Sequence, residues 1–190
     1  MRSTNPIRSC VVLLRLTSLV LADVVLSTCS QDPLPRPSQS GQNTFGCLIN
    51  GNAYVPDGGP AFSGIKPVTG GLSLRFGSIA TQIGIFVLAH AKDKQQVNLL
   101  LNNSKPGRYP LTFTTAVSPA AVSPKDYGLY ISSNGDEYVT SANYTGWINL
   151  VKADTTTGIV AGTFEFTAAT PGGRTVTVTN GRFDVNPRTQ

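Results

Sequence analysis

Charged side chains, histidine and tryptophan are scarce in this chain of 190 residues. Only 13% of the residues are charged, whereas an ordinary soluble domain has about 25%. The formal net charge is +5, but the lysines and arginines are scattered singly and form no basic run. Nucleic-acid-binding proteins concentrate their basic residues on one face or along one helix. We therefore expect no nucleic-acid partner.

The chain also lacks a recognisable catalytic spacing. His90 is the single histidine, which excludes a His-rich metal site, and nothing indicates a Ser-His-Asp arrangement around it. Asp136 and Glu137 are adjacent, so on a strand they would point to opposite faces and would not act as a pair. A Ca²⁺ site in the turn at 132–137 is an alternative, although it would need about six oxygen ligands. Most other acidic residues are assigned to turns, whereas Asp184 alternates with Phe183 and Val185 on a predicted strand. We expect no catalytic, cofactor-binding or metal-binding residues, and no enzymatic activity.

The first 28 residues have the features of an export signal of the lipoprotein type. Arg2 and Arg8 precede an apolar stretch at 11–26, which is too short and too interrupted for a stable membrane span. The stretch ends in Leu-Ser-Thr-Cys, which resembles a bacterial lipobox with an unusual threonine at position 28. Cys29 is therefore the expected lipidation site. An ordinary signal peptide and an uncleaved anchor are the alternatives.

Residues 29–43 follow as the lipidated cysteine and a segment rich in proline, serine and glutamine. Such a composition cannot bury a core, so a disordered tether is predicted. Lipid chains on Cys29 would anchor the protein stably to a membrane. The expected partner is thus a membrane, and the expected location is the bacterial cell envelope, at its outer membrane.

The remainder, 44–190, alternates apolar and polar residues with the period of two that is typical of strands. About ten short strands separated by turns predict an all-β domain, mostly antiparallel, which we interpret as a β-sandwich. Asn-Gly pairs at 50–51 and 134–135 predict two hairpin turns of one type. Residues 83–89 are apolar on both faces and predict a central, covered strand. A loop is predicted up to Gly71, with a strand following it.

The clearest element is a hairpin at 158–185. Phe164 and Phe166 share one face of its first strand, and Val176 and Val178 share one face of the second. Gly181 interrupts the alternation before Phe183, which predicts a bulge or bend. Substituting Phe164 is therefore expected to disturb the core.

Few aromatic residues fall outside this pattern. Trp147 lies on the opposite face of its strand from Ile148 and Leu150, so it is the centre of a possible binding platform that also includes Tyr130 and Tyr138 and could extend to Tyr54. The alternative is that these aromatics are core residues or cross-strand pairs. Cys47, between apolar neighbours, is expected to be a small core residue, with a reactive thiol as the alternative.

Several motifs together resemble an uncharacterised family of lipoproteins from Bacteroidota. They are Ile-Asn-Gly at 49–51, Gly-Arg-Tyr at 107–109, Gly-Thr-Phe-Glu-Phe at 162–166 and Val-Thr-Val-Thr-Asn-Gly-Arg-Phe at 176–183. The resemblance covers about 45–185 and implies an all-β fold and an envelope location, with no catalytic residues. We therefore expect a membrane-tethered structural or binding module, with a glycan or an envelope protein as its partner. An extracytoplasmic hydrolase acting on polysaccharide or peptide is the alternative.

Overall fold

The computed structural model describes residues 32–74, 83–112 and 126–190, so the predicted signal peptide and Cys29 lie outside the described residues. Residues Pro33–Gln190 form one compact unit. The described residues contain no helix that is long and apolar enough to cross a membrane. Eleven strands are found in them: β1 (Thr44–Ile49), β2 (Asn52–Tyr54), β3 (Val68–Leu74), β4 (Ile83–His90), β5 (Gln96–Leu101), β6 (Gly107–Leu111), β7 (Tyr127–Ile131), β8 (Glu137–Val139), β9 (Gly146–Ala153), β10 (Val160–Ala169) and β11 (Thr175–Val185).

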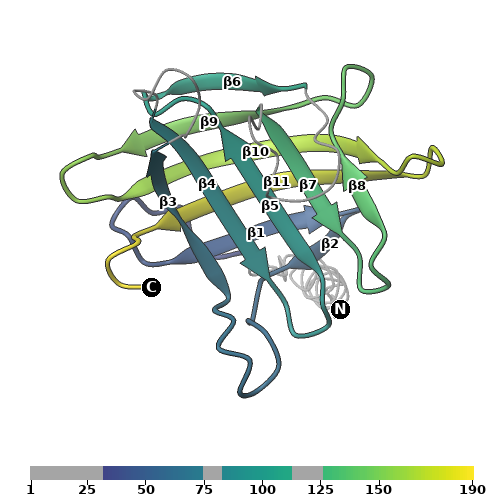
Figure 1. The fold of residues 1–190 in the computed structure, drawn as a ribbon, viewed down its shortest axis with the longest axis horizontal. Helices are drawn as coiled ribbons and strands as arrows, with labels where there is room; N and C mark the ends of the chain where they lie inside the picture. The colour runs from purple at the N-terminus through teal and green to yellow at the C-terminus, as the bar shows by residue number, and fades with distance from the viewer. Residues whose placement is uncertain (1–31, 75–82, 113–125) are drawn as a thin grey trace, which may run out of the picture. The chain divides into compact units, whose positions relative to one another are not determined.

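All of these strands pair antiparallel in one curled sheet, which confirms the predicted all-β, antiparallel class. The order β3-β4-β5-β7-β8 forms a front layer, and β2-β1-β11-β10-β9-β6 forms a rear layer. The two are joined where Val139 of β8 pairs with Ala169 of β10. Figure 1 shows the front strands crossing over the rear strands. The layers face each other, because residues of β4, β5, β9 and β11 line one small apolar void between them.

The core follows from the alternation in the β10–β11 hairpin. Val160, Phe164, Phe166 and Ala168 all point inward from β10 and are buried. Phe164 is 0% exposed, and its ring centre lies 5.2 Å from that of Phe45 and 6.3 Å from that of Phe183. Buried rings at such separations add stability beyond the area they bury. The predicted inward face of this hairpin is confirmed.

Gly181 lies at the predicted bulge. Phe164 pairs with Gly181, but Phe166 already pairs with Val178, so β11 carries one extra residue between these pairs. Asn180 takes a positive φ of 53° at this point. A Cβ on Gly181 would lie only 2.5 Å from the Cζ atom of Phe164. The bulge therefore lets the phenyl ring lie directly on the glycine backbone.

The hairpin turns differ from one another. Asn50 and Gly51 both have positive φ, as the predicted type requires. At the second Asn-Gly pair only Gly135 has a positive φ. The connection there is longer, because five residues, Ser132 to Asp136, join β7 to β8. This turn closes by a hydrogen bond from the Gly135 N–H to the Ser132 carbonyl. The expectation of two identical turns was wrong for this reason.

Two further expectations need correction. Strand β3 begins at Val68, so the predicted loop ends four residues earlier than expected. Gly70 and Gly71 are part of the strand, where Gly70 leaves room for the neighbouring β4 backbone. The strand predicted to be covered on both faces is β4. Its inward side chains Ile85, Val87 and Ala89 are buried, but Phe86 and Leu88 on its outer face are only half-buried.

Candidate functional site

A proline-rich segment, residues 33–43, lies along the outer face of the rear layer; we call it the strap. Leu34 of the strap is buried, and Pro35 packs against Gly46 of β1, where a Cβ would approach its Cδ atom to 2.5 Å. This differs from the predicted domain start at residue 44, because residues 33–43 belong to the compact unit. Composition indicated a tether since the strap has little apolar surface of its own.

A buried carboxylate holds the strap in place. Asp184 is 1% exposed, although its side chain points outward from β11, on the side opposite Phe183 and Val185. Its oxygens accept hydrogen bonds from the backbone N–H groups of Ser40 at 3.1 Å, Gly41 at 2.8 Å and Gln42 at 3.2 Å. Successive backbone N–H groups of this kind form a concave anion site. Asp184 therefore lies within the predicted strand and fastens the strap to it.

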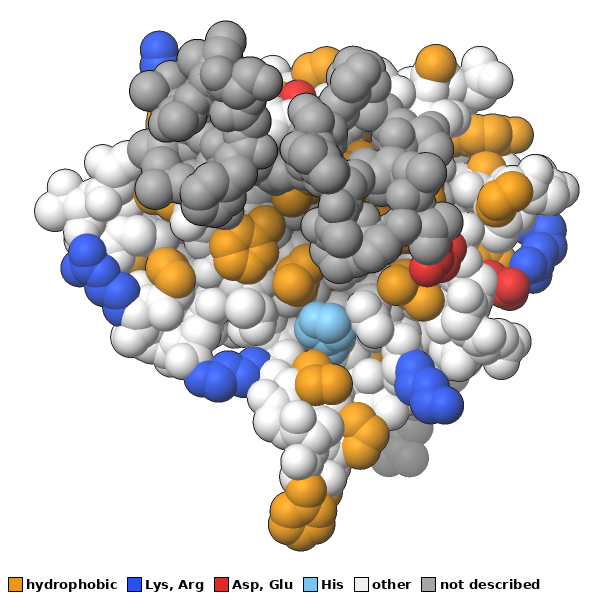
Figure 2. Space-filling model, viewed as in Figure 1, with side chains coloured by type: hydrophobic (Ala, Val, Ile, Leu, Met, Phe, Trp, Pro, Cys, Tyr) orange, Lys and Arg blue, Asp and Glu red, His pale blue; other side chains and the backbone are white. Residues whose placement is uncertain are grey.

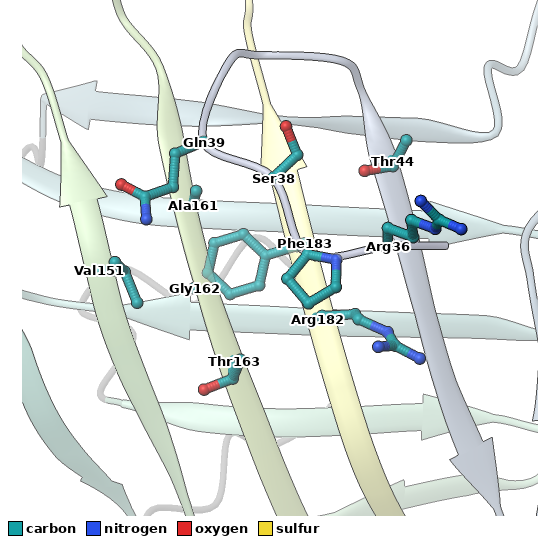
Figure 3. A pocket seen from close by; sticks show the side chains of 11 residues that line it. Arg36, Ser38, Gln39, Thr44, Val151, Ala161, Gly162, Thr163, Arg182 and Phe183 are labelled. Carbon is teal, nitrogen blue, oxygen red and sulfur yellow. The ribbon is translucent and has the colours of Figure 1, made fainter. Parts of the chain in front are cut away.

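The strap and the sheet enclose a pocket of about 250 Å³, the strap pocket, shown in Figure 3. Its floor is formed by β10 and β11 at Gly162 and Phe183, and Val151 and Ala161 form an apolar wall. Polar side chains surround this floor from both the strap and the sheet. They are Arg36, Ser38 and Gln39 of the strap, Thr44 of β1, Thr163 of β10 and Arg182 of β11.

The electrostatic character of the strap pocket is positive. Arg36 and Arg182 line it, and Figure 3 shows both guanidinium groups between β11 and β1. Lys152 lies at its border, where the ammonium group donates to the Gln39 carbonyl at 3.0 Å. No Asp or Glu is among the described residues that line the pocket. The nearby Asp184 carboxylate has its oxygens directed at the backbone N–H groups of the strap.

A second depression, the Trp147 groove, lies farther along the same layer and has a volume of about 260 Å³. Trp147 of β9 is directly opposite Glu165 of β10 and Pro110 of β6 in the strand register. The Arg108 guanidinium lies 4.2 Å from the indole centroid, a favourable cation–π contact. Hydroxyl-bearing residues complete the groove: Thr145, Thr167, Thr177 and Thr179. An open surface that combines an indole ring, a carboxylate and several hydroxyl groups matches the mixed apolar and polar character of a sugar.

The other predicted platform residues lie elsewhere. Tyr130 is 8% exposed and faces the interior, where its hydroxyl bonds the Gln95 side-chain oxygen at 2.7 Å. Tyr138 is half-buried beside it, with ring centres 5.7 Å apart. Tyr54 is buried, and its hydroxyl donates to the Ala89 carbonyl. The structure thus brings Tyr130 and Tyr138 together in the core and leaves Trp147 apart from them on the rear surface.

The remaining titratable residues considered as candidates are buried or make contacts that stabilise the fold. His90, the pale blue side chain in Figure 2, stands at the end of β4, where partial burial lowers its pKa. Asp136 is bound by two nitrogens of Arg174, which lowers the pKa of its carboxyl group. Cys47 is buried in the core, and burial raises the pKa of its thiol, which keeps it protonated and unreactive. The described residues include no group of three or more His, Cys, Asp or Glu placed to hold a metal ion.

The loop that joins β2 to β3 projects from the domain and carries exposed apolar side chains. Figure 2 shows hydrophobic side chains at the tip of the loop that joins β2 to β3. Phe62 there is fully exposed, with a positive φ of 72°, and Val55 and Ile65 are about half exposed. Because this loop is convex, it cannot enclose a small ligand. The strap pocket and the Trp147 groove are therefore the better candidates for ligand binding.

Fold and surface together define an all-β domain with two depressions on its rear layer. The chain belongs to the family described as domain of unknown function (DUF6252), whose model matches residues 77–187, more than half of the chain. This confirms the expectation of an uncharacterised family. No curated protein and no solved structure matches the chain significantly.

The alternation of apolar and polar residues predicted that Trp147 lies on the outer face of its strand. The sequence did not predict the strap pocket. Nothing in the sequence marks Arg36, Arg182 and Asp184 as neighbours. The one available signal is the position of Asp184 between Phe183 and Val185, where a carboxylate on a covered strand needs a partner.

Replacing Asp184 with Asn tests how the strap is held. The amide keeps the size of the side chain but places an N–H₂ group among backbone donors, so at least one of them loses its acceptor. We expect a loss of about 1–3 kcal/mol in the free energy of unfolding and faster amide hydrogen exchange at 40–42. Asp93→Asn, an exposed change outside the strap, serves as the control. Unchanged exchange at 40–42 would contradict the proposed role of Asp184.

Proposed function

We propose that this protein is a non-enzymatic binding module, tethered by lipid on Cys29 to the bacterial outer membrane, that binds a glycan in the Trp147 groove. The observation that carries the proposal is the position of Trp147 on the outer face of β9, opposite Glu165 and beside four threonines. A single half-buried indole in a groove lined with hydroxyl groups is suited to a ligand with both apolar and polar faces.

The chemistry of a sugar fits this groove. A pyranose ring presents a face of C–H groups, which can lie against an indole, while its hydroxyl groups both donate and accept hydrogen bonds. Glu165 supplies acceptors, the threonine hydroxyls supply either partner, and Arg108 beside the indole supplies donors. The groove is shallow and extends along the strands, which suits a segment of a polymer.

The hydrolase alternative has less support in this groove. Glycosidases generally need two carboxyl groups on opposite sides of the scissile bond. Among the described residues that line the Trp147 groove, Glu165 is the only carboxylate. A single carboxylate can position a sugar hydroxyl, but it cannot serve as both the acid and the base or nucleophile of this mechanism. This composition favours binding over cleavage.

The strap affects how the proposed tether would work. Because residues 33–43 lie on the domain, only four peptide steps separate Cys29 from Pro33. Four residues span at most about 14 Å. A lipid on Cys29 would therefore hold the domain directly at the membrane surface, rather than at the end of a long stalk.

Glycan binding is tested with Trp147→Ala in the full chain, purified in detergent. We expect the wild type to co-sediment with insoluble peptidoglycan or with one of a panel of immobilised envelope polysaccharides. Loss of the indole is expected to weaken this binding at least about tenfold, because a central tryptophan contributes about 2 kcal/mol or more at binding sites. Phe62→Ala, which removes an exposed ring outside the groove, is the matched control. Equal binding by both variants would rule out the Trp147 groove.

Cys29→Ala tests the anchor separately. Without the thiol no lipid can be attached, so we expect the variant to leave the membrane fraction and to incorporate no labelled fatty acid. Cys47→Ala, at a buried cysteine, controls for the loss of a thiol and is expected to remain in the membrane fraction. Labelling of Cys29→Ala equal to that of the wild type would show that the proposed lipid site is wrong.

A further inference from the structure

The strap pocket has the features of a ligand site that is separate from the Trp147 groove. Its lining comes from two parts of the chain more than a hundred residues apart, the strap and strands β9 to β11. Its roof is fixed in place, since Asp184 binds the backbone of Ser40, Gly41 and Gln42, and Asn43 accepts from the Asn186 N–H at 2.7 Å. A cavity of constant shape costs little to organise when a ligand enters.

The charges around the strap pocket select for an anion. Arg36 and Arg182 line it from two segments, the strap and β11, and Lys152 stands at its border. A guanidinium group offers paired N–H donors that match the two oxygens of a carboxylate or the oxygens of a phosphate. An acidic group entering between the two arginines would meet no opposing carboxylate in the described lining.

The size and the floor of the pocket restrict the rest of the ligand. A volume of about 250 Å³ is below the range of roughly 300–1,000 Å³ found for drug-sized ligands, so only a small molecule or one unit of a polymer fits. The side chains of Val151 and Ala161 provide an apolar contact surface. Ser38, Thr44 and Thr163 provide hydroxyl groups at the edge of that surface. This combination suits a small hydroxylated ring that carries an acidic group.

We propose that the strap pocket binds the oxyanion of a small hydroxylated acid, either a carboxylate or a phosphate, between Arg36 and Arg182. The acid is a free molecule or the acidic unit of a polymer, and the hydroxylated ring rests on Val151 and Ala161. This site does not depend on glycan binding at Trp147. The strap then has a second purpose beyond linking the domain to its anchor, since it completes the binding site.

Isothermal titration calorimetry on the full chain in detergent tests this site with three probes: glucuronate, glucose 6-phosphate and glucose. We expect glucuronate, glucose 6-phosphate or both to bind at least about tenfold more tightly than glucose, because a hydrogen bond between charged groups exceeds a neutral one by about that factor. The relative affinities of the two acids show which oxyanion the site prefers.

Arg36→Gln is the informative variant, because Arg36 is exposed and its loss should not affect folding. We expect about tenfold weaker binding of the preferred acid, whereas Arg188→Gln, an exposed arginine outside the pocket, should bind like the wild type. Thermal unfolding of both variants checks that the fold is kept. Trp147→Ala should also bind the acid normally, which separates this site from the glycan groove.

The proposal would be overturned if glucose bound as tightly as the tighter-binding acid, if none of the three probes bound, or if Arg36→Gln and Arg188→Gln weakened binding equally. If the protein binds the acid but no glycan, only the proposal for the Trp147 groove is contradicted. If it binds a glycan but no acid, only the proposal for the strap pocket is contradicted.

Discussion

The contact between the Phe164 ring and the bare backbone of Gly181 is the constraint on which the rest of this domain depends. Strand β10 pairs with β11, β9 and β8, so it belongs to the rear layer and also connects to the front layer. Phe164 lies at the centre of this strand and touches other core rings. The bulge at Gly181 allows the ring to sit this close, because any Cβ there would overlap it. Packing at this one point thus joins the central strands of the rear layer, β1, β10 and β11.

The same bulge helps determine what the rear surface presents. On its far side β11 continues with Arg182 and Asp184 pointing outward, while Phe183 and Val185 remain in the core. Asp184 then binds the strap, and Arg182 lines the pocket beneath it. Residues 182–185 of β11 therefore contribute to the core with one face and to the candidate site with the other. This explains why the most recognisable residues of the chain are structural, even though a candidate site lies behind them.

Local patterns predicted the fold well, since alternation and the Asn50-Gly51 turn act between near neighbours. They also placed Trp147 on the outside and Phe164 on the inside. They could not predict the strap, because it is held by residues distant in the sequence: Asp184, more than 140 residues away, binds its backbone, and Leu34 and Pro35 pack at Gly46 of β1. Alternation likewise assigns a side chain to a face of its strand but not to a layer, so Tyr130 was grouped with Trp147 although it points into the core.

A double-mutant cycle between Gly181→Ala and Phe164→Leu, followed by urea unfolding of the full chain, tests the central contact most directly. In the wild-type background the added methyl group must displace the ring, at a cost of about 1–3 kcal/mol. With Leu at position 164 the methyl group has more room, so its cost should fall and the coupling free energy should reach about 1 kcal/mol or more. If Gly181→Ala costs the same in both backgrounds, the glycine backbone does not confine the ring, and the central role of this contact is contradicted.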